Sequence, residues 1–375
     1  MNHNTPLSPR PFRHLPDVQQ RVLTAAQLRA RGVTGADIGA QCRPGGSWQQ
    51  LLPGVFLLRP GPATSEERLH AVLMYAACPP VTEPGVPVRP DAGAPHPPRP
   101  PHPPRPSRPP HPPQRYADAM ITGLAALALH GFPSAPPLLS LDRIDVLVPR
   151  LRRLRSTGCA RIVRAGGVPE PERINGLPVA PVPRALADAA AHLTDAGAVR
   201  RLLTEAVRGG HCDPAAVVRE LAQARLLSRP HVVDAVGCLL AEGRAVAEDR
   251  LYRMVAEHGL PDPVWNVDLR LPGGARLGGL DAYWPDHAVA LELDTRAPRQ
   301  DDDATWSEYA RKRERLERLG ITVVHVTPKK LRDAPEQQAA AVRTALMAAG
   351  DHDPAGDHDR AGDHDPAAYV VVLPR

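Results

Sequence analysis

The spacing of hydrophobic positions changes several times along the chain and predicts three structured segments. Over residues 15–60, apolar positions recur at helical spacing and then alternate, which predicts three helices followed by a β-hairpin. Residues 116–244 predict a mixed segment with helices from residue 183 onward. Residues 245–349 predict helix, three strands, helix, strand and helix. The pattern therefore favours an α/β (α+β) multidomain fold.

Short apolar runs carry the predictions for the mixed segment. The run over 116–132 predicts a helix, and the runs over 143–150 and 160–165 predict strands. Residues 149–164 contain six arginines and no acidic residue. Such a stretch is suited to following DNA phosphates. A solvated hairpin edge protected by charge explains it equally well.

The segments that cannot bury a core set the domain boundaries. Residues 1–14 and the His/Asp-repeat tail 350–375 are expected to be disordered, and 80–115 to form a Pro-rich linker. His and Asp at short spacing can bind metal, but a regular repeat broken by Pro and Gly favours a solvated tail. The resulting domains are 15–79, 116–244 and 245–349.

The first domain has clear helix signals. Thr24 and Thr34 stand where helix N-caps are expected, and Gly32 ends the helix between them. The helix after Thr34 is predicted to run to about Cys42. Two helices joined by so short a turn are typical of a helix-turn-helix, with the following hairpin as a wing.

The stretch LDAYWPDHAVALELD, residues 280–294, places carboxylates on a predicted hairpin. If the turn centres on residues 286 and 287, paired residues have numbers that sum to 573, which sets Asp281 opposite Glu292. Glu292 and Asp294 share a face because side chains alternate along a strand. Two carboxylates so close require either a proton on one of them or a cation between them.

A divalent cation is one solution to this repulsion. Mg²⁺ is held by one or two carboxylates, with water and phosphate completing its shell. Asp281, Glu292 and Asp294 are therefore candidate ligands for Mg²⁺ or Mn²⁺. Glu248, in the preceding helix, and Lys312, in the following one, are candidate catalytic residues beside Asp281 and Glu292. Lys312 either points into this site or extends past the helix edge into solvent.

Composition and charge refine this picture. Of the 375 residues 46 are proline, about 12% against an average near 5%. Residues 1–79, 80–115 and 116–244 carry net charges of +4, +3 and +4, whereas 245–349 and 350–375 carry −2 and −4. The surplus mildly supports a nucleic-acid partner for residues 1–244. The spacing of the five cysteines suggests neither zinc nor disulfides. With no signal peptide and no membrane-spanning run, we expect a cytoplasmic protein and no membrane partner.

Apolar and glycine positions over residues 23–58 form a distinctive set: Leu28, Gly32, Val33, Ile38, Trp48, Gly54, Val55 and Phe56. With this set, residues 23–58 resemble the winged-helix N-terminal domain of the abortive-infection (AbiEi) antitoxin family. The resemblance continues over 172–193, which is typical of the middle region of that family. It implies that the second helix enters the major groove of double-stranded DNA, with Thr34, Gln41 and Arg43 as candidate base-reading residues. The alternative is that Gln41 and Arg43 are ordinary solvated helix residues that read no bases. Arg152, Arg153 and Arg155 are candidate phosphate contacts.

Residues 245–349 resemble the PD-(D/E)XK nuclease superfamily, and more closely its very-short-patch-repair-like endonuclease domains. Glu248, Asp281 and the LELD of 291–294 carry the resemblance, together with RLERLGITVVHVT. The superfamily motif ends in lysine, but position 294 is aspartate; Lys312 stands for a lysine that has moved to the next helix.

The two resemblances imply two competing functions. The first is a Mg²⁺-dependent DNA endonuclease, a hydrolase in phage defence or DNA repair. The second is an AbiEi-like transcriptional regulator or antitoxin with a catalytically degenerate nuclease fold and a toxin as partner. A protein-interaction scaffold without DNA binding is the third class.

Overall fold

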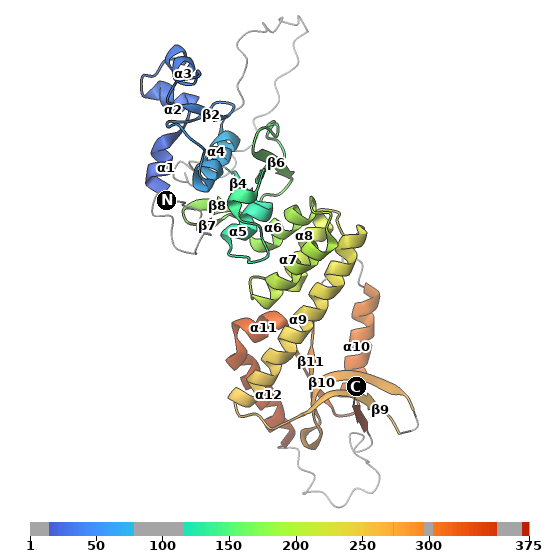
Figure 1. Cartoon of the computed structure of the whole chain (residues 1–375). Helices are drawn as coiled ribbons and strands as arrows, with labels where there is room; N and C mark the ends of the chain where they lie inside the picture. The colour runs from blue at the N-terminus through green and yellow to red at the C-terminus, as the bar shows by residue number, and fades with distance from the viewer. Residues whose placement is uncertain are drawn as a thin grey trace, which may run out of the picture. The chain divides into compact units, whose positions relative to one another are not determined.

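The protein forms two compact units, residues 1–189 and 190–375 (Figure 1). Helices and three separate sheets alternate along both units, so the predicted α+β multidomain class is confirmed. The predictions for 1–14, for the linker 80–115 and for the His/Asp repeat lie outside the described residues. The computed structural model describes residues 15–78, 116, 118–272, 274–295, 303–350 and 370–374.

The first unit opens with three helices and a hairpin, as the sequence predicts. A short strand after the first helix was not predicted; it pairs with the hairpin to give an antiparallel sheet of order β1-β3-β2. The elements are α1 (Leu15–Arg21), β1 (Val22–Thr24), α2 (Ala25–Ala30), α3 (Gly35–Gln41), β2 (Gln49–Leu52), β3 (Val55–Leu57) and α4 (Ser65–Ala77).

The caps of α2 and α3 form as the sequence predicts. Thr24 and Thr34 each accept a hydrogen bond from the backbone N–H three residues later and complete a capping box. Gly32 ends the first helix with φ of +83°, a conformation that glycine adopts without strain. A small apolar core holds these elements together; it is formed by Leu23, Leu28, Ile38 and Phe56.

A five-stranded sheet of order β6-β5-β4-β8-β7 completes the first unit. Two predictions are wrong here. The run 116–132 is a strand followed by a helix, because its first apolar residues fill the centre of the sheet. Strands β5 and β6 are parallel, so 149–164 is not a hairpin. The elements are β4 (Met120–Thr122), α5 (Gly123–Leu129), β5 (Ile144–Pro149), β6 (Ala160–Ala165), β7 (Glu172–Ile174), β8 (Leu177–Val179) and α6 (Val182–Ala190).

Buried ion pairs connect this sheet to α6. Asp188 accepts hydrogen bonds from Thr122, at 2.6 Å, and from Arg184, at 2.7 Å, while Arg161 holds Asp145. Burial raises the pKa of Asp188, against the effect of Arg184 and Thr122. All four charged groups have partners within the unit, so this cluster has a structural explanation.

The second unit begins with three helices, α7 (Ala196–Arg208), α8 (Pro214–Gln223) and α9 (Pro230–Glu257). The boundary expected between residues 244 and 245 falls inside α9, which is one continuous helix. The remaining elements are β9 (Val264–Arg270), β10 (Arg276–Trp284), β11 (Val289–Leu293), α10 (Asp303–Glu317), β12 (Thr322–Val326), α11 (Pro328–Asp333), α12 (Pro335–Gly350) and β13 (Val371–Pro374).

Five of these strands form a sheet of order β12-β11-β10-β9-β13. The predicted order helix, three strands, helix, strand, helix is present, with α11 added before the last helix. Strand β13 was not predicted: the last residues of the tail pair antiparallel with β9. The expectation of a wholly disordered tail is therefore wrong for Val371–Pro374.

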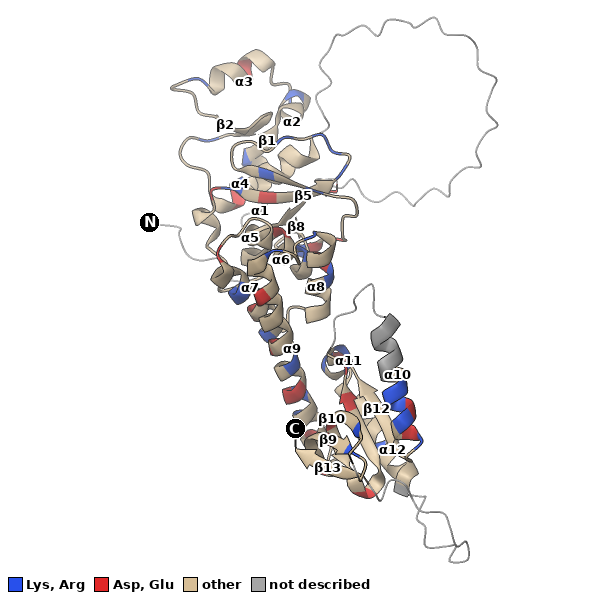
Figure 2. Cartoon of the chain, turned by 90° about the vertical axis from the view of Figure 1, so that its right-hand side faces the viewer, with Lys and Arg blue, Asp and Glu red and all other residues tan. Residues whose placement is uncertain are grey.

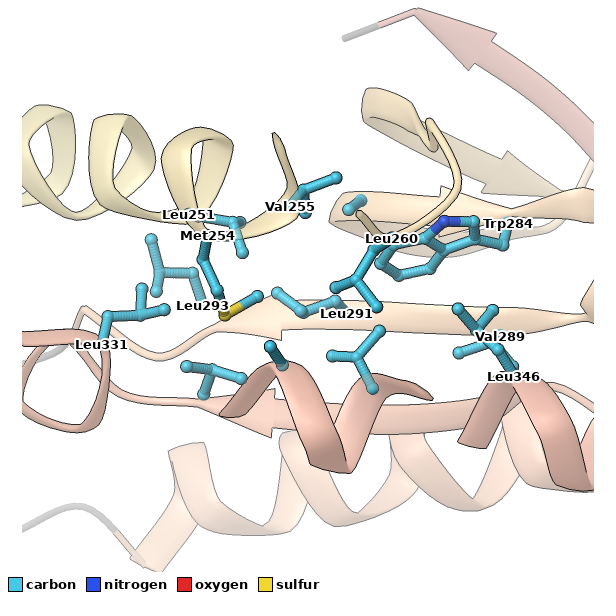
Figure 3. Close-up of a cluster of buried hydrophobic side chains, with 14 of the residues drawn as sticks. Leu251, Met254, Val255, Leu260, Trp284, Val289, Leu291, Leu293, Leu331 and Leu346 are labelled. Atoms are coloured by element: carbon cyan, nitrogen blue, oxygen red, sulfur yellow. The ribbon is translucent and has the colours of Figure 1, made fainter. Parts of the chain in front are cut away.

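Separate hydrophobic clusters cover the two faces of this sheet. On one face, α9, α11 and α12 pack against β11; Figure 3 shows Leu251 and Met254 of α9 meeting Leu291 and Leu293. On the other face, Leu316 and Ile321, from α10 and the turn after it, pack on Ala290. Strand β11 is thus buried on both sides and fixes the position of the residues that alternate along it.

We expect Leu291→Ala to lower the free energy of unfolding by about 2–5 kcal/mol, because it leaves a cavity between α9 and α12. Urea denaturation followed by tryptophan fluorescence measures this. Met347→Ala on α12 is the control, since Met347 is 66% exposed and its loss changes stability by at most about 0.5 kcal/mol. Equal effects of the two substitutions would contradict the placement of β11 in the core.

Candidate functional site

The register of β10 and β11 is the one that the sequence predicts. Ala282 pairs with Leu291, Tyr283 with Ala290 and Trp284 with Val289, so that each pair sums to 573. The paired residues end at Ala282 and Leu291, and Asp281 and Glu292 are the next residues along the two strands. Both carboxylates are buried, with 4% and 7% of their residue surface exposed.

Two groups from other elements compensate Asp281. Its Oδ2 accepts a hydrogen bond from the backbone N–H of Leu293 at 2.6 Å, across the strands. Its Oδ1 accepts one from Nη2 of Arg244 on α9, also at 2.6 Å. Nε of Arg244 lies 2.7 Å from Oε1 of Glu248, one turn later on the same helix. Arg244 therefore bridges the two carboxylates from the α9 side of the sheet.

Lys312 compensates Glu292 from the other face. Its Nζ donates to Oε1 of Glu292 at 2.8 Å and to the carbonyl of Gly279 at 2.7 Å. Lys312 therefore points inward, which decides between the two orientations considered for it. Nδ1 of His325, the partner of Glu292 on β12, lies 3.8 Å from its Oε2.

A glycine makes room for this lysine. Gly278 has φ of +132°, and a Cβ at this position would lie 2.7 Å from Cε of Lys312. Any larger residue would push the lysine side chain away from Glu292 and strain the backbone. The absence of a side chain at Gly278 therefore leaves the room through which Lys312 reaches Glu292.

These contacts explain why the strands tolerate neighbouring carboxylates. From the sequence, we expected that neighbouring carboxylates need a proton on one of them or a cation between them. The chain itself supplies two cationic side chains. Arg244 balances Asp281 and Glu248, and Lys312 balances Glu292. Each buried charge therefore has an opposite charge within hydrogen-bonding distance, which is the condition for burying it.

The donor set suits a hard divalent cation only in part. Among the described residues, no group of three or more His, Cys, Asp or Glu side chains is placed to hold a metal ion. Asp294 is exposed and follows the end of β11, so the three predicted ligands are not gathered into one group. Asp281 and Glu292 remain, and two carboxylates suffice for Mg²⁺ where phosphate oxygens complete the shell.

The candidate base-reading residues lie at the two ends of α3. Gln41 and Arg43 are exposed, at the end of the helix and just after it. The hydroxyl of Thr34 donates to Oδ2 of Asp37 at 2.6 Å and so serves the cap. This hydrogen bond lowers the pKa of Asp37. The seven residues of α3 include no lysine or arginine, so positive charge for DNA must come from its flanks.

Only some arginines of the basic stretch 149–164, which runs from the end of β5 into β6, are available to contact phosphates. Arg152 donates to the carbonyl of Ala76 at 2.8 Å and so supports the C-terminus of α4. Arg161 is held by Asp145, and Arg164 donates to backbone carbonyls within the stretch. Arg153 and Arg155 are exposed and are the members best placed to contact a phosphate.

Sequence reasoning missed Arg244, His325 and Gly278. A signal existed for Arg244, since arginine four residues before Glu248 on a helix predicts an ion pair. Its contact with Asp281 joins residues 37 positions apart and depends on where α9 lies. His325 carried a weaker signal, as a polar residue within an apolar strand.

Comparison with known proteins adds no relative. No protein-family model and no curated protein matches the chain. Across the described part of the chain, no helix combines the length and apolar character that crossing a membrane requires.

We expect Asp281→Asn to lower the free energy of unfolding by about 1–3 kcal/mol. The amide replaces one carboxylate oxygen by an NH₂ donor, which then faces a donor of Leu293 or Arg244. Urea denaturation of the full chain measures the change.

The control for this substitution is Asp249→Asn, on α9. Asp249 is 66% exposed and pairs with Arg253 on the same helix, so its loss costs at most about 1 kcal/mol. If Asp281→Asn instead stabilised the chain, repulsion between Asp281 and Glu292 would outweigh the contacts with Arg244 and Leu293.

Proposed function

We propose that the second unit is a metal-dependent DNA endonuclease of the PD-(D/E)XK type, joined to a DNA-binding first unit. The observation that carries the proposal is that Asp281 and Glu292 lie buried on two paired strands and that Lys312 contacts Glu292. Two carboxylates on adjacent strands and a lysine 2.8 Å from one of them are the side chains that phosphodiester hydrolysis requires.

The residues divide the chemical tasks between them. Asp281 and Glu292 would hold Mg²⁺ or Mn²⁺, and Glu248 would orient a water at the edge of the site. A divalent cation bound there supplies an activated water and neutralises charge on the phosphate. Lys312, already fixed by Glu292 and the carbonyl of Gly279, would place its positive charge where negative charge develops.

Arg244 must leave Asp281 before a cation can bind that oxygen. Its side chain is 38% exposed, so water can solvate the guanidinium once it is displaced. The same arginine supports the second candidate function. If Arg244 permanently takes the place of the cation, the fold is catalytically degenerate, and the chain is an AbiEi-like regulator or antitoxin with a toxin partner.

The first unit supports DNA binding in either case. The order of α1, β1, α2, α3 and the β2–β3 hairpin is the one expected of a winged helix. Exposed Gln41 and Arg43 would reach base edges from the end of α3, and the hairpin would form the wing.

For the nuclease, we expect Mn²⁺ to bind the full-length chain and DNA to be cleaved in its presence. Glu292→Gln should abolish both, because it removes a carboxylate ligand. Lys312→Gln should keep Mn²⁺ binding and lower the cleavage rate about 10²–10³-fold, the usual cost of losing one charge-stabilising donor. Calorimetry measures binding; supercoiled, linear and mismatched DNA serve as substrates.

The control for this experiment is Glu314→Gln on α10, an exposed carboxylate paired with Arg318, which should change neither property. A wild-type chain that binds no Mn²⁺ and cleaves none of the three substrates would reject the endonuclease. Mn²⁺ binding without cleavage would support the degenerate fold.

For the first unit, we expect Arg43→Ala to weaken binding to a preferred DNA sequence by about 1–3 kcal/mol and to relax sequence preference at one position. Selection of bound sequences followed by fluorescence anisotropy measures both. Arg21→Ala, an exposed arginine at the end of α1, is the control. Equal weakening on every sequence would assign Arg43 to a phosphate instead.

A further inference from the structure

An open groove lies between α7 and α9, within the second unit. Its volume is about 480 Å³, and three of its lining residues are arginines of α7. Small side chains of α9, Ala241 and Ala245, line its other side. Figure 2 shows that α9 carries charges of both signs along its length. The three arginines are Arg200, Arg201 and Arg208.

The charges of this groove are only partly compensated. Arg208 is held by Glu242, with Nε to Oε1 at 2.8 Å and Nη2 to Oε2 at 2.9 Å. Arg201 lies 3.7 Å from the exposed Asp195, a contact of little strength. Within the described part of the unit, Arg200 has no ion-pair partner. Three arginines and Glu242 leave the lining with a net positive charge.

The groove and the carboxylate site share α9. Ala245 lines the groove and precedes Glu248 by three residues, a rise of about 4.5 Å along a helix. Ala241 precedes Glu248 by seven residues, which is nearly two full turns, so Ala241 and Glu248 lie on nearly the same side of α9. Arg244, which contacts Asp281, lies between them in sequence. A ligand lying in the groove would therefore extend toward Asp281 and Glu292.

We propose that this groove binds the phosphodiester backbone of duplex DNA and leads it to the carboxylate site. Guanidinium groups bind phosphate oxygens through two parallel hydrogen bonds. The exposed guanidiniums of Arg200 and Arg201 can do so, since Arg201 has only the weak contact with Asp195, and Glu242 orients Arg208. The small side chains of α9 let a backbone approach closely. The inference rests on the proposed function for the identity of the partner.

The salt dependence of DNA binding tests the groove. Each lost phosphate contact lowers the slope of log K against log salt by about 0.9. We expect the full-length Arg200→Gln/Arg201→Gln variant to lose about 1.8 from the magnitude of this slope. Fluorescence anisotropy with a labelled DNA duplex over a range of KCl concentrations measures it. Binding of Mn²⁺ should be unchanged, because neither arginine touches the carboxylates.

A matched control removes two charges from other faces of the same unit. Arg219 lies on α8, which begins against Gly243, about 200° around α9 from Ala241 and Ala245. Arg343 donates to the carbonyl of His258, beyond the far end of α9. The Arg219→Gln/Arg343→Gln variant should keep the wild-type slope.

The outcomes separate the groove from the nuclease. An unchanged slope in the groove variant, or equal losses in both variants, overturns the inference even if the chain cleaves DNA. A reduced slope in the groove variant alone supports it, including in a chain that cleaves nothing. In that last case only the endonuclease is rejected, and the groove serves a DNA-binding protein.

Discussion

The second unit depends on how charge is balanced at the end of one strand pair. Asp281 and Glu292 are buried where β10 and β11 meet, and a charge buried there needs an opposite charge beside it. The partners come from opposite faces of the sheet, Arg244 from α9 and Lys312 from α10. Any change in the position of either helix would leave a buried carboxylate uncompensated. The ion pairs therefore constrain the fold as well as supplying the candidate chemistry.

The contacts of Arg244 with Asp281 and of Lys312 with Glu292 also determine what a metal ion would have to displace at this site. A metal ion that binds Asp281 must displace Arg244 and is opposed by the positive charge of both Arg244 and Lys312. A phosphate arriving with the metal reverses this balance, because it brings negative charge that the two cations can stabilise. Under the proposed function, a metal ion and a phosphate would therefore be expected to support each other's binding at this site.

Local rules predicted the parts of the structure that are set by neighbouring residues. The capping residues Thr24 and Thr34 act within three residues of their partners, and the register of β10 and β11 follows from one short turn. The run 116–132 failed because a short apolar run fits a buried strand as well as a helix. Strand β13 failed because its partner, β9, lies about a hundred residues earlier in the chain.

The candidate site shows the same division between local and distant information. The turn sufficed to give the register of β10 and β11 on which Asp281 and Glu292 stand, and the nuclease resemblance nominated Lys312. The contact of Arg244 with Asp281 was not predicted, because it depends on α9 being one continuous helix. That helix crosses residue 244, where a boundary between two domains was expected. That continuity is also what joins the arginine groove to the carboxylates, since Ala241, Ala245 and Glu248 lie on successive turns of one rigid helix. A break in α9 at residue 244 would part Ala241 from Ala245 in the groove and Arg244 from Glu248 beside the carboxylates, so the groove and the carboxylate cluster both depend on α9 being one helix.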